Sequence, residues 1–279
     1  MHNKMELGIV GCGVIGNSLA GLLKDMNYPV KQYDPFKGLN DDIFECEIIF
    51  VCVPTKADMK FEDVKMAVSY INLKNRKGII TIRSTIIPGT IDKFVKKYKR
   101  EFVYLPEFLR ERTALLDEIC PDKIIVGTRK REVFEIFEKL FKRVINKNKI
   151  IMMKPVEAEL LKVALNSLYT IKVVFGNELY DICQKYGADY YKLFEAFKLD
   201  KYINAMHLDP LFDGYRGAGG KCLSKDIKFL IRAARKKGIL PKVMIMADKE
   251  NVNLLEKGTL NGNRRSIRKE EYTEYNQIQ

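Results

Sequence analysis

The first 150 residues alternate between short hydrophobic runs and longer stretches in which apolar residues recur at helical spacing. The hydrophobic runs predict strands over residues 6–10, 30–33, 48–53, 78–83, 101–105 and 123–126. One helix is expected between the first two strands, over 14–27. Strands alternating with helices are typical of a parallel sheet that helices cover on both faces. The pattern therefore predicts an α/β domain with a doubly wound parallel sheet over residues 1–150.

The second half changes period and becomes helical. Residues 156–186 carry apolar side chains at helical spacing and contain no proline, which predicts one long central helix. Shorter helices are expected over 189–198, with Asp189 as N-cap, and over 224–237 and 241–257. This predicts an all-helical domain over 151–257, followed by a polar tail over 258–279.

A glycine motif joins the first predicted strand to the first predicted helix. It reads Gly11-Cys12-Gly13-Val14-Ile15-Gly16, and Asp34 ends the second predicted strand. Gly11 allows a tight turn, Gly13 lets a pyrophosphate approach the helix N-terminus, and Gly16 lets helix and strand pack closely. A carboxylate at position 34 binds the adenosine ribose and disfavours a 2′-phosphate. The sequence therefore predicts a Rossmann domain that binds NAD.

Composition narrows the classes of function. Lysine and arginine number 49 against 36 acidic residues, a net charge of +13, but the basic residues are spread along the chain, so no nucleic-acid partner is expected. No apolar run approaches the roughly 20 residues of a membrane span. The N-terminus lacks a signal-peptide pattern, so a cytoplasmic protein is predicted. The six cysteines form no Cys-x-x-Cys pair and only two histidines are present, so neither a metal site nor a disulfide framework is expected.

A second glycine-rich stretch carries a candidate nucleophile. It reads Gly217-Ala218-Gly219-Gly220-Lys221-Cys222-Leu223-Ser224-Lys225-Asp226. Cys222 immediately precedes a predicted helix, whose positive end and nearby lysines favour a thiolate. A thiol beside a nicotinamide cofactor suits an enzyme that carries an alcohol through an aldehyde to an acid, because the aldehyde must be held covalently between two hydride transfers.

Two other groups of polar residues have both functional and ordinary interpretations. Lys162 and Asn166 share a face of the long helix, where they either stabilise an oxyanion or form a solvated surface. Glu107 and Glu111 flank Arg110 after a strand end, where they either activate water or form a surface ion pair. The residues alone leave both questions open.

Taken in order, these motifs resemble the UDP-glucose/GDP-mannose dehydrogenase family over residues 6 to about 255. The matching segments are the Gly11–Gly16 motif with Asp34, Val51-Cys52-Val53-Pro54-Thr55, Ser84-Thr85-Ile86-Ile87-Pro88-Gly89-Thr90, Pro106-Glu107-Phe108-Leu109-Arg110-Glu111, Pro121-Asp122-Lys123-Ile124-Ile125-Val126-Gly127, Glu159–Asn166 and Gly217–Asp226. The resemblance implies NAD-dependent four-electron oxidation of a nucleotide sugar, with UDP-glucose favoured, and a homodimer formed through the long helix.

The resemblance also assigns roles to individual positions. Lys162 and Asn166 would hold the reacting oxygen, Thr85 and Asp226 would serve the first proton transfer, and Cys222 would form a thiohemiacetal and a thioester. Glu107 would assist thioester hydrolysis, supported by Glu111. Cofactor contacts are expected from Gly11, Gly13, Val14, Ile15, Gly16, Asp34, Val53, Pro54, Thr55, Ser84, Thr85 and Glu111. Substrate contacts are expected from Glu107, Phe108, Leu109, Arg110, Lys162, Asn166, Gly219 and Lys225.

Three departures keep alternatives open. Ser224 stands where the family usually has proline, and Leu105 where it commonly has asparagine. The chain also ends before a further domain that family members carry. It is therefore interpreted as an active short dehydrogenase, as half of a split or truncated enzyme whose partner polypeptide supplies that domain, or as a non-enzymatic NAD-binding remnant. A related β-hydroxyacid dehydrogenase, with one hydride transfer and no need of Cys222, is a fourth hypothesis.

Overall fold

The computed structural model describes residues 5–56, 60–211, 214–220 and 222–258. The predicted polar tail, apart from Gly258, and Lys221 lie outside these residues. The chain divides into two compact units, residues 1–162 and 163–279, and the helix α6 (Pro155–Tyr186) belongs partly to each.

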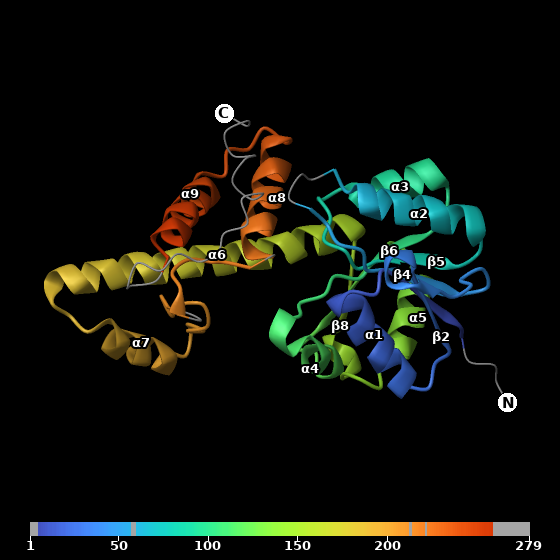
Figure 1. Cartoon of the computed structure of the whole chain (residues 1–279), viewed down its shortest axis with the longest axis horizontal. Helices are drawn as coiled ribbons and strands as arrows, with labels where there is room; N and C mark the ends of the chain where they lie inside the picture. The colour runs from blue at the N-terminus through green and yellow to red at the C-terminus, as the bar shows by residue number, and fades with distance from the viewer. Residues whose placement is uncertain (1–4, 57–59, 212–213, 221, 259–279) are drawn as a thin grey trace. The chain divides into compact units, whose positions relative to one another are not determined.

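The first unit is built on an eight-stranded mixed sheet (Figure 1). Its strands are β1 (Leu7–Val10), β2 (Val30–Asp34), β3 (Leu39–Asn40), β4 (Ile48–Val51), β5 (Ile79–Ile82), β6 (Phe102–Tyr104), β7 (Ile124–Gly127) and β8 (Ile150–Met153), in the spatial order β3-β2-β1-β4-β5-β6-β7-β8. Neighbours from β2 through β6 pair in parallel, as the alternating pattern predicts. The Rossmann fold predicted for this region is confirmed.

Two strands were not expected, and the sheet is not wholly parallel. β3 pairs antiparallel to β2, and its two residues are too few to leave a hydrophobic pattern. β8 follows directly on the short 3₁₀ helix η3 (Lys147–Lys149) and pairs in parallel with β7. β7 itself runs antiparallel to β6, paired through Tyr104 and Gly127. The expectation of six strands was therefore too low.

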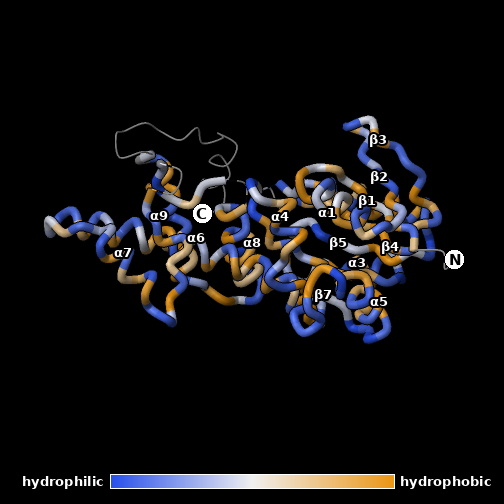
Figure 2. Tube along the Cα trace, turned by 90° about the horizontal axis from the view of Figure 1, so that it is seen from below, coloured by the Kyte–Doolittle hydropathy of each residue, from blue (hydrophilic) through white to orange (hydrophobic). Residues whose placement is uncertain are grey.

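Helices cover both faces of this sheet. The helices α1 (Val14–Asp25), α4 (Ala114–Ile119) and α5 (Arg131–Phe141) lie on one face, and α2 (Glu62–Lys74) and α3 (Thr90–Tyr98) on the other (Figure 1). Hydrophobic residues are concentrated along β1 and β4 (Figure 2). The buried core joins these strands to α1 and α5, and the Phe50 and Phe137 rings meet edge to face with centroids 6.5 Å apart. This packing leaves the carboxyl ends of the strands available for a site.

The second unit is helical among its described residues. It contains most of α6, then α7 (Tyr190–Leu199), α8 (Leu223–Arg235) and α9 (Lys242–Lys257). All four helices agree with the predicted ranges to within two residues. The Asp189 side chain caps α7 by accepting a hydrogen bond from the Tyr191 N–H, at 2.9 Å, as expected. A small apolar core formed by Val174, Ile227, Ile231, Ala247 and Leu254 holds α6, α8 and α9 together.

Candidate active site

The first glycine motif is packed tightly at two positions and open at the third. A Cβ atom on Gly11, whose φ is +90°, would lie 2.8 Å from the Val53 nitrogen, and one on Gly16 would lie 2.0 Å from the Gly11 carbonyl oxygen. A Cβ on Gly13 would meet no described atom within 4 Å. Gly13 is also the N-cap of α1 and supplies no capping side chain. The first backbone N–H groups of α1 are thus suited to bind a pyrophosphate.

Asp34 is held against this motif at the end of β2. Its Oδ2 accepts a hydrogen bond from the Cys12 N–H, at 2.9 Å, and the Lys37 ammonium donates to the Cys12 carbonyl, at 2.7 Å. The carboxylate is therefore fixed next to the loop in which the phosphates of a dinucleotide would lie. These residues fit NAD, since the ribose hydroxyls of the adenosine would meet a carboxylate.

The loops after β4 and β5 are joined by a serine. The Ser84 hydroxyl donates to the Val53 carbonyl, at 2.7 Å, so that the segment Val53–Thr55 lies against the start of the segment Ser84–Gly89. Thr85 is buried, with 8% of its surface exposed. The predicted cofactor residues of these two loops are thus brought together at one edge of the sheet.

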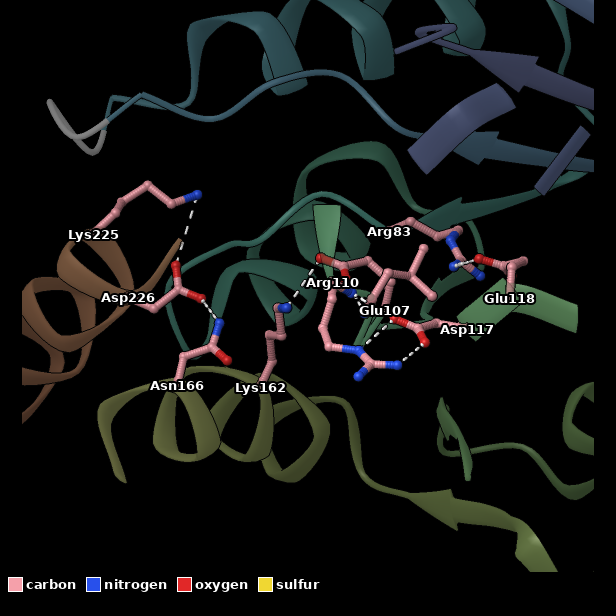
Figure 3. A network of polar contacts seen from close by, with 10 residues as sticks. Arg83, Glu107, Arg110, Asp117, Glu118, Lys162, Asn166, Lys225 and Asp226 are labelled. Carbon is pink, nitrogen blue, oxygen red and sulfur yellow. Dashed lines mark hydrogen bonds and ion pairs between the residues drawn. The ribbon is translucent and has the colours of Figure 1, made fainter. Parts of the chain in front are cut away.

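A buried ion pair connects the loop after β6 to α6 (Figure 3). The Lys162 ammonium donates to Glu107 Oε1 at 3.0 Å, and Oε2 of the same carboxylate accepts from the Leu109 N–H at 2.8 Å. Burial opposes ionisation of Glu107, but the Lys162 ammonium and the Leu109 N–H outweigh it and lower the pKa of this carboxyl below its ordinary value. Glu107 is therefore ionised near neutral pH.

A second buried ion pair, which the sequence analysis did not foresee, lies in the same unit. Arg83 Nη2 and Glu118 Oε2 are 2.8 Å apart, and both side chains are almost fully buried (Figure 3). Burial raises the pKa of Glu118, although Arg83 opposes this, and Arg83 also contributes to the lowered pKa of Glu107. The only sequence signal was a charged residue, Arg83, at the end of a hydrophobic strand.

The residues after Glu107 face different partners. The Phe108 ring lies 5.7 Å from the Lys162 ammonium and 4.5 Å from that of Lys123. Arg110 forms a two-pronged ion pair with Asp117, not with Glu107, and its hydrogen bond lowers the pKa of Asp117 below the ordinary range. Glu111 begins the 3₁₀ helix η2 (Glu111–Thr113). The carboxylate partner of Arg110 is thus Asp117 on α4, a partner that the sequence analysis did not expect.

The second unit contains a separate polar pair. The Asn166 amide on α6 donates to Asp226 Oδ2 on α8 at 2.6 Å, and Asp226 is fully buried (Figure 3). The Lys225 ammonium lies 3.7 Å from Asp226 Oδ1. Thr170 on α6 also donates to the Leu223 carbonyl at the start of α8, at 3.4 Å, and so ties the same two helices together. The candidate base and the candidate oxygen-binding amide are therefore direct neighbours.

Cys222 lies at the N-terminal end of α8, in a loop that buried side chains hold. It is the N-cap residue and is exposed. The Asn251 side chain on α9 bonds both the N–H and the carbonyl of Ala218, at 2.6 and 3.1 Å, and the Ser224 hydroxyl bonds the same carbonyl at 3.0 Å. Its position at the N-terminal end of α8 places Cys222 in the positive potential of that helix, without a capping hydrogen bond from its side chain.

Two residues that hold this loop were not predicted. Arg216 is buried and bonds the side chain and carbonyl of Asn177, at 2.9 and 3.1 Å, and also pairs with Asp181. Asn251 is fully buried, and its position in register with the apolar residues Ala247 and Leu254 was the available signal. A polar residue on the apolar face of a helix requires a buried partner, which here is the loop backbone.

Cysteine exposure separates Cys222 from most of the other thiols. Cys12, Cys46, Cys52 and Cys183 are buried, and only Cys120 is exposed as Cys222 is. Burial raises the pKa of the Cys46 and Cys52 thiols to about 12. Among the described residues, no group of three or more His, Cys, Asp or Glu side chains is placed to hold a metal ion. Nor does that part of the chain contain a helix long and apolar enough to cross a membrane.

This fold and its glycine loop define a dinucleotide-binding protein of the Rossmann class. Residues 19–145 match the NAD binding domain of the UDP-glucose/GDP-mannose dehydrogenase family, and residues 156–253 match its central domain. The chain belongs to the UDP-glucose/GDP-mannose dehydrogenase family.

Individual relatives agree with the family assignment. A UDP-glucose 6-dehydrogenase from Rickettsia bellii is 30% identical over 232 residues, covering 77% of this chain and 52% of the relative. A Methanocaldococcus jannaschii protein of uncharacterised function is 30% identical over 279 residues, which are 92% of this chain and 30% of that protein. The solved UDP-glucose dehydrogenase of Pyrobaculum islandicum superposes with a TM-score of 0.78 at 25% identity, over 92% of this chain and 72% of that one. The chain thus spans about half the length of the first relative.

Proposed function

We propose that this chain catalyses the NAD-dependent oxidation of the primary alcohol of a nucleotide sugar to a carboxylate, and that UDP-glucose is the first substrate to test. The observation that carries the proposal is the placement of Cys222. It is an exposed thiol at a helix N-terminus, four residues before Asp226, which accepts a hydrogen bond from Asn166. The other unit of the chain contains an NAD-binding domain. UDP-glucose is chosen because several relatives of this chain are UDP-glucose dehydrogenases.

The first step converts the alcohol to an aldehyde. The glycine motif and Asp34 would hold NAD, which when bound would supply the hydride acceptor for both oxidation steps. Asp226, with Thr85 and a water molecule, takes the hydroxyl proton, and the Asn166 amide orients the carboxylate that receives it. Lys162 and Asn166 lie one turn apart on α6 and stabilise the negative charge that develops on the substrate oxygen.

The second step proceeds through the thiol. The Cys222 sulfur adds to the aldehyde carbon and forms a C–S bond, which gives a thiohemiacetal. Loss of a hydride and a proton leaves a thioester, and water then breaks the C–S bond to release the acid and restore the thiol. Glu107 is ionised and accepts the proton of that water. The sum is one alcohol, two NAD⁺ and one water converted to one carboxylate, two NADH and three protons.

The test counts NADH against acid with purified protein, NAD and UDP-glucose. Two NADH per uronate are expected. Cys222→Ser is expected to lower acid formation on the order of a thousandfold or more, and the matched variant of the other exposed thiol, Cys120→Ser, is expected to retain it. No turnover with UDP-glucose, UDP-N-acetylmannosamine and GDP-mannose, while NAD still binds, would overturn the proposal for this chain acting alone.

The Cys222→Ser variant also distinguishes the β-hydroxyacid dehydrogenase hypothesis from the thioester route. An enzyme of that type transfers one hydride and has no covalent intermediate. One NADH per product, with full activity in Cys222→Ser, would therefore support that hypothesis and exclude the thioester route.

We also propose that the chain forms a homodimer through α6. Three hydrophobic residues, Leu168, Phe175 and Ile182, recur every seven positions along α6, and each leaves about half of its surface exposed (51%, 50% and 52%). A seven-residue apolar repeat is the pattern by which helices pack against one another. Sedimentation equilibrium at micromolar concentration is expected to give a dimer, and Phe175→Glu a monomer. A wild-type monomer would exclude the dimer.

A further inference from the structure

Glu159 is a buried carboxylate for which neither the fold prediction nor the proposed reaction has a use. It lies on α6, three residues before Lys162, and none of its surface is exposed. Its two oxygens accept hydrogen bonds from separate backbone N–H groups, Oε2 from Gly89 and Oε1 from Ile91, the latter at 2.8 Å. A buried carboxylate whose two oxygens both accept hydrogen bonds from backbone N–H groups has a specific structural task.

These two N–H groups belong to the start of α3. Gly89 is the N-cap of α3, has a φ of +88°, and carries no side chain that could cap the helix. The first N–H groups of a helix have no partner within it and carry its positive potential. Glu159 therefore caps α3 from a different element and fixes the loop that precedes α3 to α6.

The loop held in this way is the segment Ser84–Gly89, which follows β5 and contains Thr85. Ser84 is attached separately, through its hydrogen bond to the Val53 carbonyl. The far end of this segment is held by Glu159, through its hydrogen bonds from the Gly89 and Ile91 N–H groups. The two attachments thus lie on either side of Thr85.

The same stretch of α6 also holds the neighbouring loop. Lys162, on the same face of α6 as Glu159, forms the buried ion pair with Glu107, which follows β6. One turn of α6 therefore attaches the loops after two adjacent strands, β5 through Glu159 and β6 through Lys162.

We infer that Glu159 is a positioning residue that sets the distance of Thr85 from Lys162 and Glu107 by capping α3 from α6. The inference rests on the proposed function, in which Thr85 serves the first proton transfer. Loss of the Glu159 contacts releases the far end of the Thr85 loop but leaves Ser84 and the cofactor-binding glycine motif in place. Because the glycine motif, Asp34 and Ser84 keep their contacts, the effect should fall mainly on turnover, with only a small effect on NAD affinity through Thr85.

The test compares Glu159→Gln with Glu178→Gln at pH 8. Glu178 lies on the same helix and is exposed, so it provides the same charge change without the cap. Glu159→Gln puts an amide NH₂ against one of the two backbone donors. In hydrogen exchange, the Gly89 and Ile91 amides are expected to lose protection about tenfold or more, with the Gly11–Gly16 motif unchanged. Glu178→Gln should match wild type throughout.

The kinetic arm uses the same proteins with NAD and UDP-glucose. In Glu159→Gln, kcat is expected to fall on the order of a hundredfold, while the KM for NAD stays within about twofold. Glu159→Asp keeps the carboxylate on a shorter side chain and should recover part of kcat. A purely structural role would lower the amount of folded enzyme and leave kcat per folded molecule and its KM unchanged.

The hydrogen-exchange and kinetic experiments can each contradict the inference independently. Unchanged exchange at Gly89 and Ile91 in Glu159→Gln would overturn the inference even if the enzyme is active. Lost protection with unchanged kcat would overturn the positioning role and retain only the cap. If wild type has no turnover, the proposed function fails, and exchange still decides whether Glu159 holds the loop. Should Glu159→Gln not fold, Glu159→Asp is measured in both arms.

Discussion

The two glycine-rich loops of this chain obtain their shapes in different ways. In the first, Gly11 and Gly16 are required because backbone atoms of the same motif or of the next strand occupy the space of a side chain. In the second, buried side chains hold the turn: Asn251 comes from α9, and Arg216, which directly precedes the loop, bonds Asn177 on α6. A Cβ on Gly217 would meet side chains of α9, the nearest at 3.1 Å, and one on Gly220 would meet no described atom within 4 Å. A loop shaped by close backbone contact is visible in a local motif, whereas a loop held by distant polar groups is not.

The substitution Gly16→Ala tests most directly whether close backbone contact shapes the first loop. Its Cβ would lie 2.0 Å from the Gly11 carbonyl oxygen, a backbone atom that cannot move without displacing β1 from α1. We expect a loss of unfolding free energy of at least about 4 kcal/mol, measured by urea denaturation. A loss below about 1 kcal/mol would show that the first loop has room to adjust.

The buried cap at Glu159 predicts a pH dependence. Burial raises the pKa of Glu159 to about 7 from 4.5, despite its backbone hydrogen bonds. The folded state thus retains a proton that the unfolded chain has lost, so unfolding free energy should fall as pH rises from about 4.5 to 7 and then level off. The full change is on the order of 3 kcal/mol. Glu159→Gln has no such proton, so the difference between the two stability curves isolates the effect. A flat difference would contradict it.

Asn251→Ala tests the side chains that hold the second loop. It removes two hydrogen bonds to Ala218 and leaves the buried Ala218 N–H without its acceptor, although the Ser224 hydroxyl still donates to the carbonyl. The loss should cost about 2 kcal/mol of unfolding free energy. Asn253→Ala, an exposed asparagine on the same helix, is the control and should be close to neutral. Equal effects of the two substitutions would argue against the buried bonds as the source of the loop's shape.

The smallest effect on stability is expected for Gly13→Ala. The φ of Gly13 is −74°, which alanine adopts without strain, and its Cβ would meet no described atom within 4 Å. Unfolding free energy should change by less than about 0.5 kcal/mol. NAD affinity should nevertheless fall, because the methyl group would stand where the pyrophosphate approaches the backbone. Calorimetric titration with NAD that shows unchanged affinity would remove Gly13 from the cofactor site.

The fold was largely predictable because it depends on local patterns. The hydrophobic runs located β1, β2 and β4–β7, and helical spacing without proline located α6. β3 left no such pattern, because it has only two residues. β8 is a hydrophobic run, but it lies where the first domain was expected to end and was not assigned as a strand.

The candidate site was predictable by residue but not by partner. Lys162, Glu107, Asn166 and Asp226 were each named from sequence, yet nothing in their spacing showed that Lys162 pairs with Glu107 and Asn166 with Asp226, at separations of 55 and 60 residues. The Arg83–Glu118 pair was missed for the same reason, and so were the backbone partners of Glu159, which the sequence indicated only as the start of the Glu159–Asn166 segment. Periodicity reports which face of an element is buried, but it does not report which distant backbone or charge that face meets.

The distribution of buried and exposed cysteines allows the folded fraction of this protein to be measured by thiol labelling. Four of the six thiols are buried and two, Cys120 and Cys222, are accessible. A thiol-reactive dye should therefore label two sites on the native chain and six on the denatured one, and the label count reports folding without an added probe. With Cys120 replaced by serine, the single remaining native label marks Cys222 alone, so that the occupancy of the glycine-rich loop by a nucleotide sugar becomes visible as protection from the dye.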